Sequence, residues 1–558
     1  MDVTICGGLA VVETSLIRLL WPHHEVGVDS PYGIFTRHAW TIFLAQYLAL
    51  KYYRIFLYHK YFSPLRHVPG PTNNHFFLGQ TINLLKAETP TTLYVQWMKQ
   101  FPDAPFIRYL SIANTEVLVP NNINAHKEVL QTQCYSFSKS KFFLRIVREV
   151  AGHGLILMEG DEHRAHRKML GGSFSLQNIR KLEPIFKEKA KDICRFFEET
   201  IKNSNGMTGS FDCTNTFSKA ILDIMGSAIL GVDLNYVKPG EVHDQRQDGV
   251  AGRKQNGLRD RCTFHEAYDL FFSPGTVGKL LLFMNGWVPT RWLPLEANRE
   301  FLSAMDWLNE VLTTIIRDRY RVIRAAMQDG TYEQKDSRDF VTFVVEESIR
   351  GGTAQMIGEK EFLGHILEFM AAGHDTSANM LSWSCYIMAT NHSIQDRLRE
   401  EIGSLSAEPS FVEMDKLPYL ENFVKEALRM YSPSTTYHRE ANHDLTIEGI
   451  HIPKGTPLDL CPSVTHSNPT IWGADADSAD PTRWEHLNAQ QASPYAFEAF
   501  SNGPRICIGK QFAQFEIKTI LVEMVRNYRF LTVEHPFKVE NPGFTLRPGG
   551  LEVRIEKI

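Results

Sequence analysis

No part of the sequence constrains the structure more than Phe500-Ser-Asn-Gly-Pro-Arg-Ile-Cys-Ile-Gly509, which sets one cysteine among an aromatic ring, two glycines and an arginine. Gly503 and Gly509 let backbone N–H groups approach the sulfur, and Arg505 supplies positive charge. Residues 510–529 are predicted to form a helix whose N-terminus favours an anion. We therefore expect Cys507 to be ionised and able to ligate a metal ion.

A lone cysteine in a glycine-containing turn is more often structural than a ligand, but this ten-residue pattern is far more specific. F-x-x-G-x-R-x-C-x-G resembles the haem-ligand loop of the cytochrome P450 enzymes, whose axial iron ligand is a cysteine thiolate. The resemblance implies that Cys507 binds the iron of haem b (iron protoporphyrin IX), that Arg505 contacts a haem propionate, and that Phe500 packs beside the sulfur.

Residues 361–391 are predicted to form a long, largely apolar helix interrupted by Ala-Ala-Gly-His-Asp-Thr-Ser at 371–377. Gly373 costs such a helix about 1 kcal/mol relative to Ala. Close helix packing at Gly373, with Thr376 bonded to a carbonyl one turn earlier, is one explanation. The other is the family's distal-helix signature, in which the helix opens over the iron and leaves room for dioxygen. That resemblance implies that Asp375 and Thr376 are catalytic and deliver protons to bound oxygen.

A charged network is predicted from Glu426 and Arg429, which share one face of a helix spanning residues 420–430. Alone, this pair could be a surface ion pair worth under about 1 kcal/mol. Residues 472–484 resemble the family's irregular segment before the cysteine loop, where a second arginine, here Arg483, completes a buried Glu-Arg-Arg network. The resemblance implies a structural role for these three residues.

Three further residues are predicted to bind the haem propionates. His163 and Arg167 stand four apart on a helix beginning near Gly160, and Arg439 follows the helix that carries Glu426. The family usually has Trp at the position of His163. Because histidine is also a donor, propionate binding survives the change, although His163 would respond to pH. A solvated basic helix face is the alternative explanation.

The fold is predicted to be mainly α with minor β, the cytochrome P450 fold, in a single large haem-binding domain over residues 72–558. No repeat, composition break or Gly/Ser linker divides this range. Residues 445–455 alternate and turn like a hairpin, and Leu551, Val553 and Ile555 alternate like a terminal strand. Residues 240–257 are polar and glycine-rich, which indicates a loop insertion or a gene-model error.

The N-terminus is predicted to hold a membrane anchor helix over residues 39–58, followed by a Pro-rich hinge over 59–71. An interfacial or ordinary core helix is the alternative. Residues 1–38 form a separate segment whose run from Val3 to Leu20 is a candidate for membrane contact. Residues 51–66 carry four basic residues and no acid, whereas residues 1–36 carry four acids and one arginine. The positive side faces the cytosol, which predicts a cytosolic catalytic domain at the endoplasmic reticulum membrane.

The eight cysteines are scattered without C-x-x-C spacing, as in a reducing compartment. A formal net charge of −5 gives no reason to propose nucleic acid as a partner. A local basic patch of Arg164, Lys168, Lys510 and Lys518 is a candidate docking site for an acidic electron donor, with ordinary solvated side chains as the equal alternative.

The resemblance implies a monooxygenase that takes electrons from NADPH through a separate NADPH–cytochrome P450 reductase and hydroxylates or epoxidises a hydrophobic small molecule. Members from filamentous fungi, many of which make secondary metabolites, look most similar. An O2-independent haem-thiolate isomerase or dehydratase, or a non-catalytic haem or ligand carrier, is the alternative function. Possible substrate contacts, each equally explained as core, are Phe142, Phe143, Phe369, Ala372, Ser434, Thr435 and Thr436.

Overall fold

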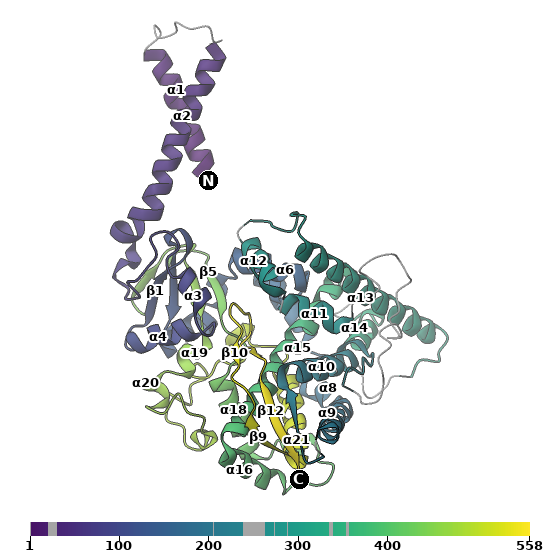
Figure 1. Cartoon of the computed structure of the whole chain (residues 1–558). Helices are drawn as coiled ribbons and strands as arrows, with labels where there is room; N and C mark the ends of the chain where they lie inside the picture. Colours follow the sequence, from purple (N-terminus) through teal and green to yellow (C-terminus); the bar gives the residue numbers. More distant parts are fainter. Residues whose placement is uncertain are drawn as a thin grey trace.

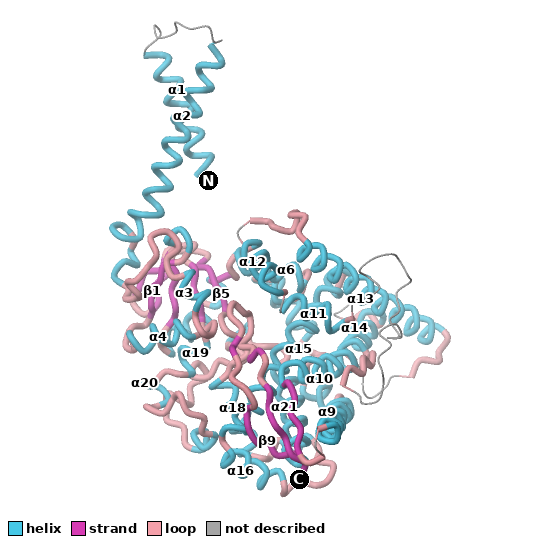
Figure 2. Tube along the Cα trace, in the orientation of Figure 1, coloured by secondary structure: helices cyan, strands magenta, loops and turns pink. Residues whose placement is uncertain are grey.

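Helices dominate the molecule, and short strands gather in small sheets beside them (Figure 2). The computed structural model describes residues 2–20, 31–204, 206–237, 263–272, 274–286, 288–333, 339–352 and 357–558. The predicted mainly helical fold with minor β-structure is confirmed. The predicted insertion at 240–257 lies outside the described residues.

One long helix, α15 (Glu359–Thr390), runs through the centre of the helical region (Figure 1). It begins two residues before the predicted start, and the side chain of Glu361 accepts a hydrogen bond from the backbone N–H of Gly358 at 3.2 Å. Its most extensive helix partner is α10 (Cys213–Met225). Most of its side chains are buried, so α15 is a scaffold against which other elements are positioned.

The remaining helices of the main body are mostly amphipathic and cover this centre, and the predicted helices near 420–430 and 510–529 are both present. They are α3 (Thr81–Lys86), α4 (Thr92–Gln100), α5 (Ile123–Lys127), α6 (Lys141–Ala151), α7 (Gly160–Leu170), α8 (Leu176–Arg180), α9 (Glu183–Asn203), α11 (Phe264–Phe272), α12 (Gly275–Asn285), α13 (Glu296–Gln328), α14 (Phe340–Ile349), α16 (His392–Ile402), α17 (Phe411–Met414), α18 (Pro418–Met430), α19 (Pro462–His466), α20 (Pro469–Trp472) and α21 (Lys510–Asn527).

The largest sheet has the order β1-β2-β8-β5-β3 and combines segments that are far apart in sequence. The predicted hairpin at 445–455 is confirmed as β6 and β7, and the predicted terminal strand is confirmed as β12, which pairs with β4 and β9. The strands are β1 (Phe106–Leu110), β2 (Glu116–Pro120), β3 (Phe137–Ser138), β4 (Thr208–Asp212), β5 (Tyr437–Ala441), β6 (Leu445–Ile447), β7 (Ile450–Ile452), β8 (Pro457–Leu460), β9 (Tyr528–Val533), β10 (Lys538–Val539), β11 (Pro548–Gly549) and β12 (Glu552–Lys557).

One hydrophobic core joins most of the chain, because its buried residues extend from Ile146 to Ile555 and include those of α10, α15 and α21. A smaller core lies beneath the five-stranded sheet and contains Phe106, Phe137 and Leu458. Residues distant in sequence therefore share one packed interior, as the prediction of a single large domain requires.

The predicted charged network is buried. Arg429 donates to both oxygens of Glu426, at 2.9 and 2.7 Å, and Arg483 Nε lies 3.5 Å from Glu426 Oε1. The backbone N–H of Asp480 and the indole N–H of Trp484 also donate to Glu426, each at 2.9 Å. This carboxylate is thus saturated with donors and ties α18 to residues 480–484.

The N-terminal segment forms two helices, α1 (Asp2–Leu20) and α2 (Pro31–Tyr52), that lie side by side and project from the main body (Figure 1). Helix α2 begins at Pro31, eight residues before the anchor predicted at 39–58. A π-helical segment, Tyr53–Phe62, follows it and includes the end of the predicted anchor. Within the described residues, no helix combines the length and apolar character needed to cross a membrane.

The segment predicted as a hinge is packed on the main body. The carbonyl of Pro69 accepts a hydrogen bond from the backbone N–H of Arg108 in β1 at 2.8 Å. A Cβ at Gly70 would lie 1.7 Å from the Arg108 carbonyl oxygen, so only glycine fits there. The Pro-Gly-Pro segment is therefore held against the five-stranded sheet.

Replacing Arg429 with Met should lower the free energy of unfolding by about 3–5 kcal/mol, because it leaves the buried carboxylate of Glu426 without its main partner. The control is Arg317→Met, which removes an exposed two-bonded pair with Glu359 and should cost under about 1 kcal/mol. Chemical unfolding followed by circular dichroism measures both. Equal losses in the two variants would contradict a structural role for the buried network.

Candidate active site

The cysteine loop holds Cys507 just before α21, as the sequence predicts. The backbone N–H of Cys507 donates to the carbonyl of Phe500 at 2.9 Å. Gly503 has a φ of +70°, and a Cβ there would lie 2.1 Å from the carbonyl oxygen of Leu130, so this turn requires glycine. The loop is consequently fixed by its neighbours, and the position of the sulfur is defined.

The expectation that Cys507 is ionised by its protein surroundings is wrong. Burial raises the pKa of the Cys507 thiol, and the backbone N–H of Gly509 and the charge of Arg167 oppose this shift without cancelling it. Desolvation of the sulfur therefore outweighs the helix N-terminus and the nearby cations. A metal cation bound to the sulfur would supply the missing positive charge.

Two of the predicted site residues have solvent-accessible area. Cys507 is exposed by its solvent-accessible area, although protein atoms surround it closely enough to desolvate the thiol. Ala372 is likewise exposed within α15, while Ala371, His374 and Asp375 of the same stretch are buried. Both exposures are explained if Cys507 and Ala372 border an interior hollow, which is what a large flat cofactor needs.

A cluster of cationic side chains lies near the cysteine loop, and Arg505 is its centre. One guanidinium nitrogen of Arg505 pairs with Glu159, another donates to the carbonyl of Met158 at 3.4 Å, and its Nε is buried without a partner among the described residues. The Lys139 ammonium donates to the same Glu159 at 3.2 Å. Burial and the charge of Arg505 lower the pKa of Lys139 to about 8.

The predicted propionate ligands belong to the same electrostatic cluster. Burial, then Arg505, lowers the pKa of Arg439. Burial, followed by Arg505, Lys139 and Arg167, lowers the pKa of His163 to about 4. His163 is therefore neutral at physiological pH as long as no anion lies beside its ring. Its Nδ1 has no partner among the described residues.

This cluster fits the two propionates of the haem that the sequence implies. Five basic side chains influence one another here, and Glu159 is the carboxylate that contacts two of them. Buried charges need opposite charges and hydrogen bonds, and two carboxylates would supply both. We expect Cys507 to hold the iron and the propionates to be held by His163, Arg167, Arg439 and Arg505. The sequence analysis did not predict Lys139 as a member of this cluster, because nothing in the neighbouring sequence indicates such a role.

Thr376 and Asp375 lie in an unbroken stretch of α15 and have different surroundings. The Thr376 hydroxyl donates to the carbonyl of Ala372 at 2.6 Å. Asp375 is buried and accepts hydrogen bonds from Asn379 at 2.9 Å and from Thr545, while Arg547 lies 3.8 Å away. Burial raises the pKa of Asp375, although Arg547 and Thr545 oppose the shift. Thr545 and Arg547 come from the C-terminal segment, which the sequence did not link to Asp375.

Gly373 packs against the end of a side chain of α10. A Cβ at this position would lie 2.6 Å from Cε and 2.9 Å from Sδ of Met225. These atoms are the flexible end of the methionine side chain, which can turn away, so the contact alone does not require glycine. Helix α15 is α-helical through this stretch.

A cavity of about 420 Å³ extends from Arg439 toward α6, α11 and α12. Its volume is that of a small-molecule site. Three of the possible substrate contacts, Phe142, Thr435 and Thr436, line it. Phe143 packs against the ring of His438, with centroids 5.8 Å apart, and Ser434 forms an isolated bridge with Thr545. Phe369 is core, because its ring packs on those of Phe174 and Phe340.

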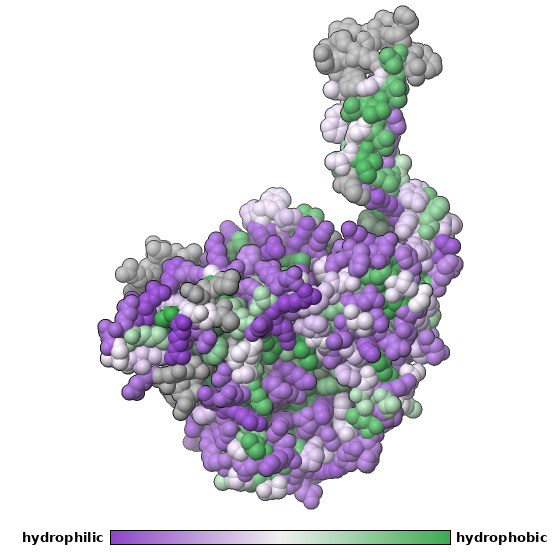
Figure 3. Space-filling view, turned by 180° about the vertical axis from the view of Figure 1, so that it is seen from behind, coloured by the Kyte–Doolittle hydropathy of each residue, from purple (hydrophilic) through white to green (hydrophobic). Residues whose placement is uncertain are grey.

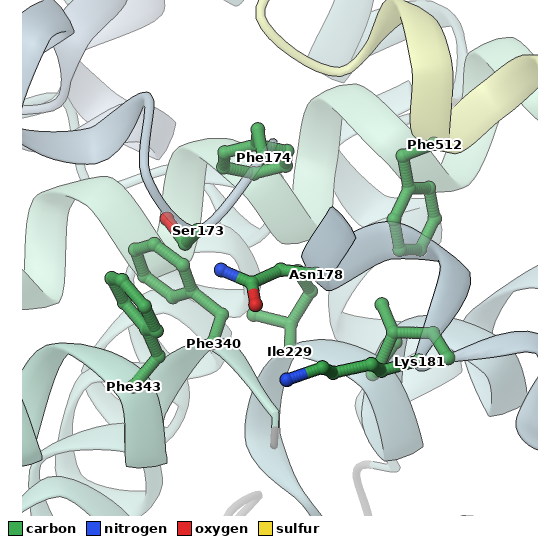
Figure 4. A pocket seen from close by; sticks show the side chains of 10 residues that line it. Ser173, Phe174, Asn178, Lys181, Ile229, Phe340, Phe343 and Phe512 are labelled. Atoms are coloured by element: carbon green, nitrogen blue, oxygen red, sulfur yellow. The ribbon is translucent and has the colours of Figure 1, made fainter. Parts of the chain in front are cut away.

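Figure 4 shows a second, separate cavity between α8, α14 and α21. Phe174, Phe340, Phe343 and Phe512 surround it together with Ser173 and Asn178. Its volume is about 20 Å³, which is room for one water molecule. It is therefore a packing defect of the core and no candidate for substrate binding.

The basic patch is smaller than predicted. Lys518 is buried and pairs with Asp415 and Glu421, each at 2.7 Å. Arg164 pairs with Asp161 and lies over the ring of Tyr135. Lys168 is exposed and Lys510 is partly exposed. Lys518 is consequently removed from the patch, because its charge is compensated inside the structure.

Comparison with known proteins agrees with this geometry. The family model described as Cytochrome P450 matches residues 68–555. Cytochrome P450 monooxygenase sphH of Aspergillus fumigatus is 28% identical, with 89% of each chain covered. Cytochrome P450 monooxygenase FUM15 of Gibberella moniliformis is 26% identical, again with 89% of each chain covered. Cytochrome P450 4F8 of Homo sapiens is 27% identical over 98% of this chain and 100% of its own.

Replacing Arg505 with Gln should weaken haem binding about 10- to 150-fold, the loss expected from about 1.5–3 kcal/mol for a hydrogen bond to a charged group. The matched control is Arg529→Gln, whose side chain is partly exposed and pairs with Asp396. Haem transfer to a scavenger protein, followed in the Soret band, measures the release rate. Unchanged release in the Arg505 variant would show that the cationic cluster does not hold the propionates.

Proposed function

Because this chain belongs to the cytochrome P450 family, we propose that it is a haem-thiolate monooxygenase that hydroxylates or epoxidises a hydrophobic small molecule. Electrons would come from NADPH through a separate NADPH–cytochrome P450 reductase. The observation that carries this proposal is the intact pair of Asp375 and Thr376, placed on α15 next to the exposed face of Ala372. Two relatives named as monooxygenases each match 89% of the chain, and the match spans 89% of their own length.

When bound, haem supplies the activation of dioxygen, with the thiolate as its electron-donating ligand. The protein's own part is to hold the group and to control protons. Cys507 would bind the iron, and the cluster around Arg505 would fix the orientation of the ring by its propionates. The apolar walls of α15 exclude water, which protects a reactive intermediate from side reactions.

Asp375 and Thr376 supply the proton path. The raised pKa of Asp375 lets the carboxyl keep a proton at a higher pH than an exposed aspartate does. Arg547 lies 3.8 Å from Asp375 and 3.1 Å from the partly exposed Asp269. Because a guanidinium stays protonated, it would orient Asp375 and stabilise its charge without relaying protons itself. Thr376 could exchange its bond to the Ala372 carbonyl for one to a ligand in the hollow. Asp375 and Thr376 would thus be the groups that hold and pass the proton.

A hydrophobic substrate is supported by the lining of the 420 Å³ cavity. Phenylalanines contribute much of its wall: Phe142, Phe271, Phe272, Phe283 and Phe544. Polar and charged residues line it as well, among them Thr435, Lys279 and Asp459. Aromatic walls with interspersed polar groups are typical of sites that bind small molecules. Similarity to fungal monooxygenases supports a role in fungal secondary-metabolite biosynthesis.

A location at the endoplasmic reticulum membrane with a cytosolic catalytic domain completes the proposal. Large apolar residues on α1 and α2 are exposed, which favours contact with lipid. Free cysteines support a reducing compartment, because no disulfide joins any of the seven cysteines that the structure describes.

Thr376→Ala should uncouple the reaction. Without the hydroxyl, product formation should fall by roughly 10²-fold, the lower end of the rate contribution of a positioned proton-transfer group. NADPH consumption should continue, with its electrons released as hydrogen peroxide. The measurement is product, peroxide and NADPH in reconstituted microsomes, with a substrate found by its shift of the Soret band. Ser382→Ala is the control, since Ser382 makes the same type of bond one turn back in α15, to Ala378. Unchanged product formation without peroxide would favour the isomerase or dehydratase.

Reversing the charges of Lys168 and Lys510 should slow reduction by the reductase, most strongly at low salt, because both lie beside the cysteine loop and an acidic donor would be repelled. Stopped-flow reduction under carbon monoxide measures the rate. Lys538→Glu, at an exposed position in β10, is the control. Equal rates for all variants would rule out docking on this patch.

A further inference from the structure

The two N-terminal helices lie antiparallel, so that the start of the chain points back toward the catalytic domain (Figure 1). The Asp2 carboxylate pairs with Lys51 at 3.1 Å and with Arg54 at 2.8 Å. Further along, the amide of Gln46 donates to Glu13 at 2.8 Å. Since Lys51 and Arg54 lie where α2 leads into the main body, Asp2 lies at the base of the projection and not at its tip (Figure 1).

The hairpin buries small residues and exposes large apolar ones, the reverse of a helix pair that packs in water. Its buried positions on α1 are small residues four apart, Cys6, Ala10 and Thr14. Small residues at this spacing let helices approach closely within a bilayer, where polar side chains also pair across the helix interface. The large apolar side chains are exposed instead, and green patches run along the projecting helices in Figure 3. The exposed residues are Val3, Ile5, Leu9, Val11, Val12, Leu16, Ile17, Leu19, Trp40, Leu44 and Leu48.

We propose that α1 and α2 insert together into a lipid bilayer as a hairpin, with Asp2 on the same side of the membrane as the catalytic domain. This inference rests on the membrane location proposed above. It differs from the sequence-based expectation of one anchor at 39–58, which would place residues 1–36 on the opposite side.

The charges agree with this arrangement. Neither helix by itself has the length and apolar character to cross a membrane, so insertion depends on the pair, in which Glu13 and Gln46 bond each other. At about 1.5 Å per residue, the 19 residues of α1 reach roughly 28 Å from the base, close to the thickness of the apolar layer of a bilayer. Asp2, Lys51 and Arg54 then lie together at the headgroup level, where they stay paired. A single anchor would have to separate Asp2 from both cations. Glu13 would keep its hydrogen bond to Gln46 inside the hairpin.

Glycosylation mapping of the full chain tests the topology. An N-terminal tag with an Asn-Gly-Thr acceptor should gain no glycan, and protease should remove it from sealed microsomes as readily as it digests the catalytic domain. The same chain with a cleavable secretory signal before the tag shows that a lumenal tag is recognised. A glycosylated, protected tag on the chain without that signal would overturn the proposal.

Alkaline carbonate extraction tests insertion itself. The unaltered chain should stay in the membrane pellet, and the combined outward substitutions Leu9→Gln, Val12→Gln, Leu44→Gln and Leu48→Gln should lose that carbonate-resistant fraction. Val322→Gln with Val412→Gln, at exposed apolar positions of the catalytic domain, should keep it. Release of the unaltered chain, or retention of the outward variant, would overturn the proposal. Monooxygenase activity in the same microsomes reports separately on the proposed function.

Discussion

Charges taken out of water must be paired, and this constraint separates the two buried charged clusters of the protein. Around Glu426, two guanidinium groups, an indole and a backbone N–H surround one carboxylate, so the cluster is complete. Around Arg505, five basic side chains influence one another, but the carboxylate of Glu159 contacts only Arg505 and Lys139, and the Nε donor of Arg505 has no partner among the described residues. The first cluster holds the fold together, and the second needs an anionic group.

The same constraint explains how the cofactor and the protein depend on each other. Cys507 is buried enough for its thiol pKa to rise, so it needs a cation at the sulfur. The lowered pKa values of Lys139, His163 and Arg439 show that the basic residues need anions nearby. Haem carries both, an iron cation at its centre and two propionates at its edge. We therefore expect the loaded protein to be considerably more stable than the same chain without haem.

The sequence predicted the parts of the site that local spacing determines. The cysteine loop, the Asp375-Thr376 pair and the Glu426–Arg429 pair each lie within one short segment, so their patterns can be read directly. Lys139, Thr545 and Arg547 could not be found this way, because they reach the site from distant segments. Burial was the other source of error: it raises the pKa of the Cys507 thiol and removes Lys518 from the surface. The return of α1 to the domain depends on the pairing of Asp2 with Arg54, which no local pattern reveals.

The most direct test of the central claim is the carbon monoxide difference spectrum of the dithionite-reduced protein in membranes, recorded beside Cys507→Ser. The account predicts a Soret band strongly shifted to the red, as thiolate ligation produces, and its loss in the serine variant while the protein remains folded. A well-folded protein without such a band, or a band that persists in the serine variant, would contradict haem ligation by Cys507 and the mechanism built on it.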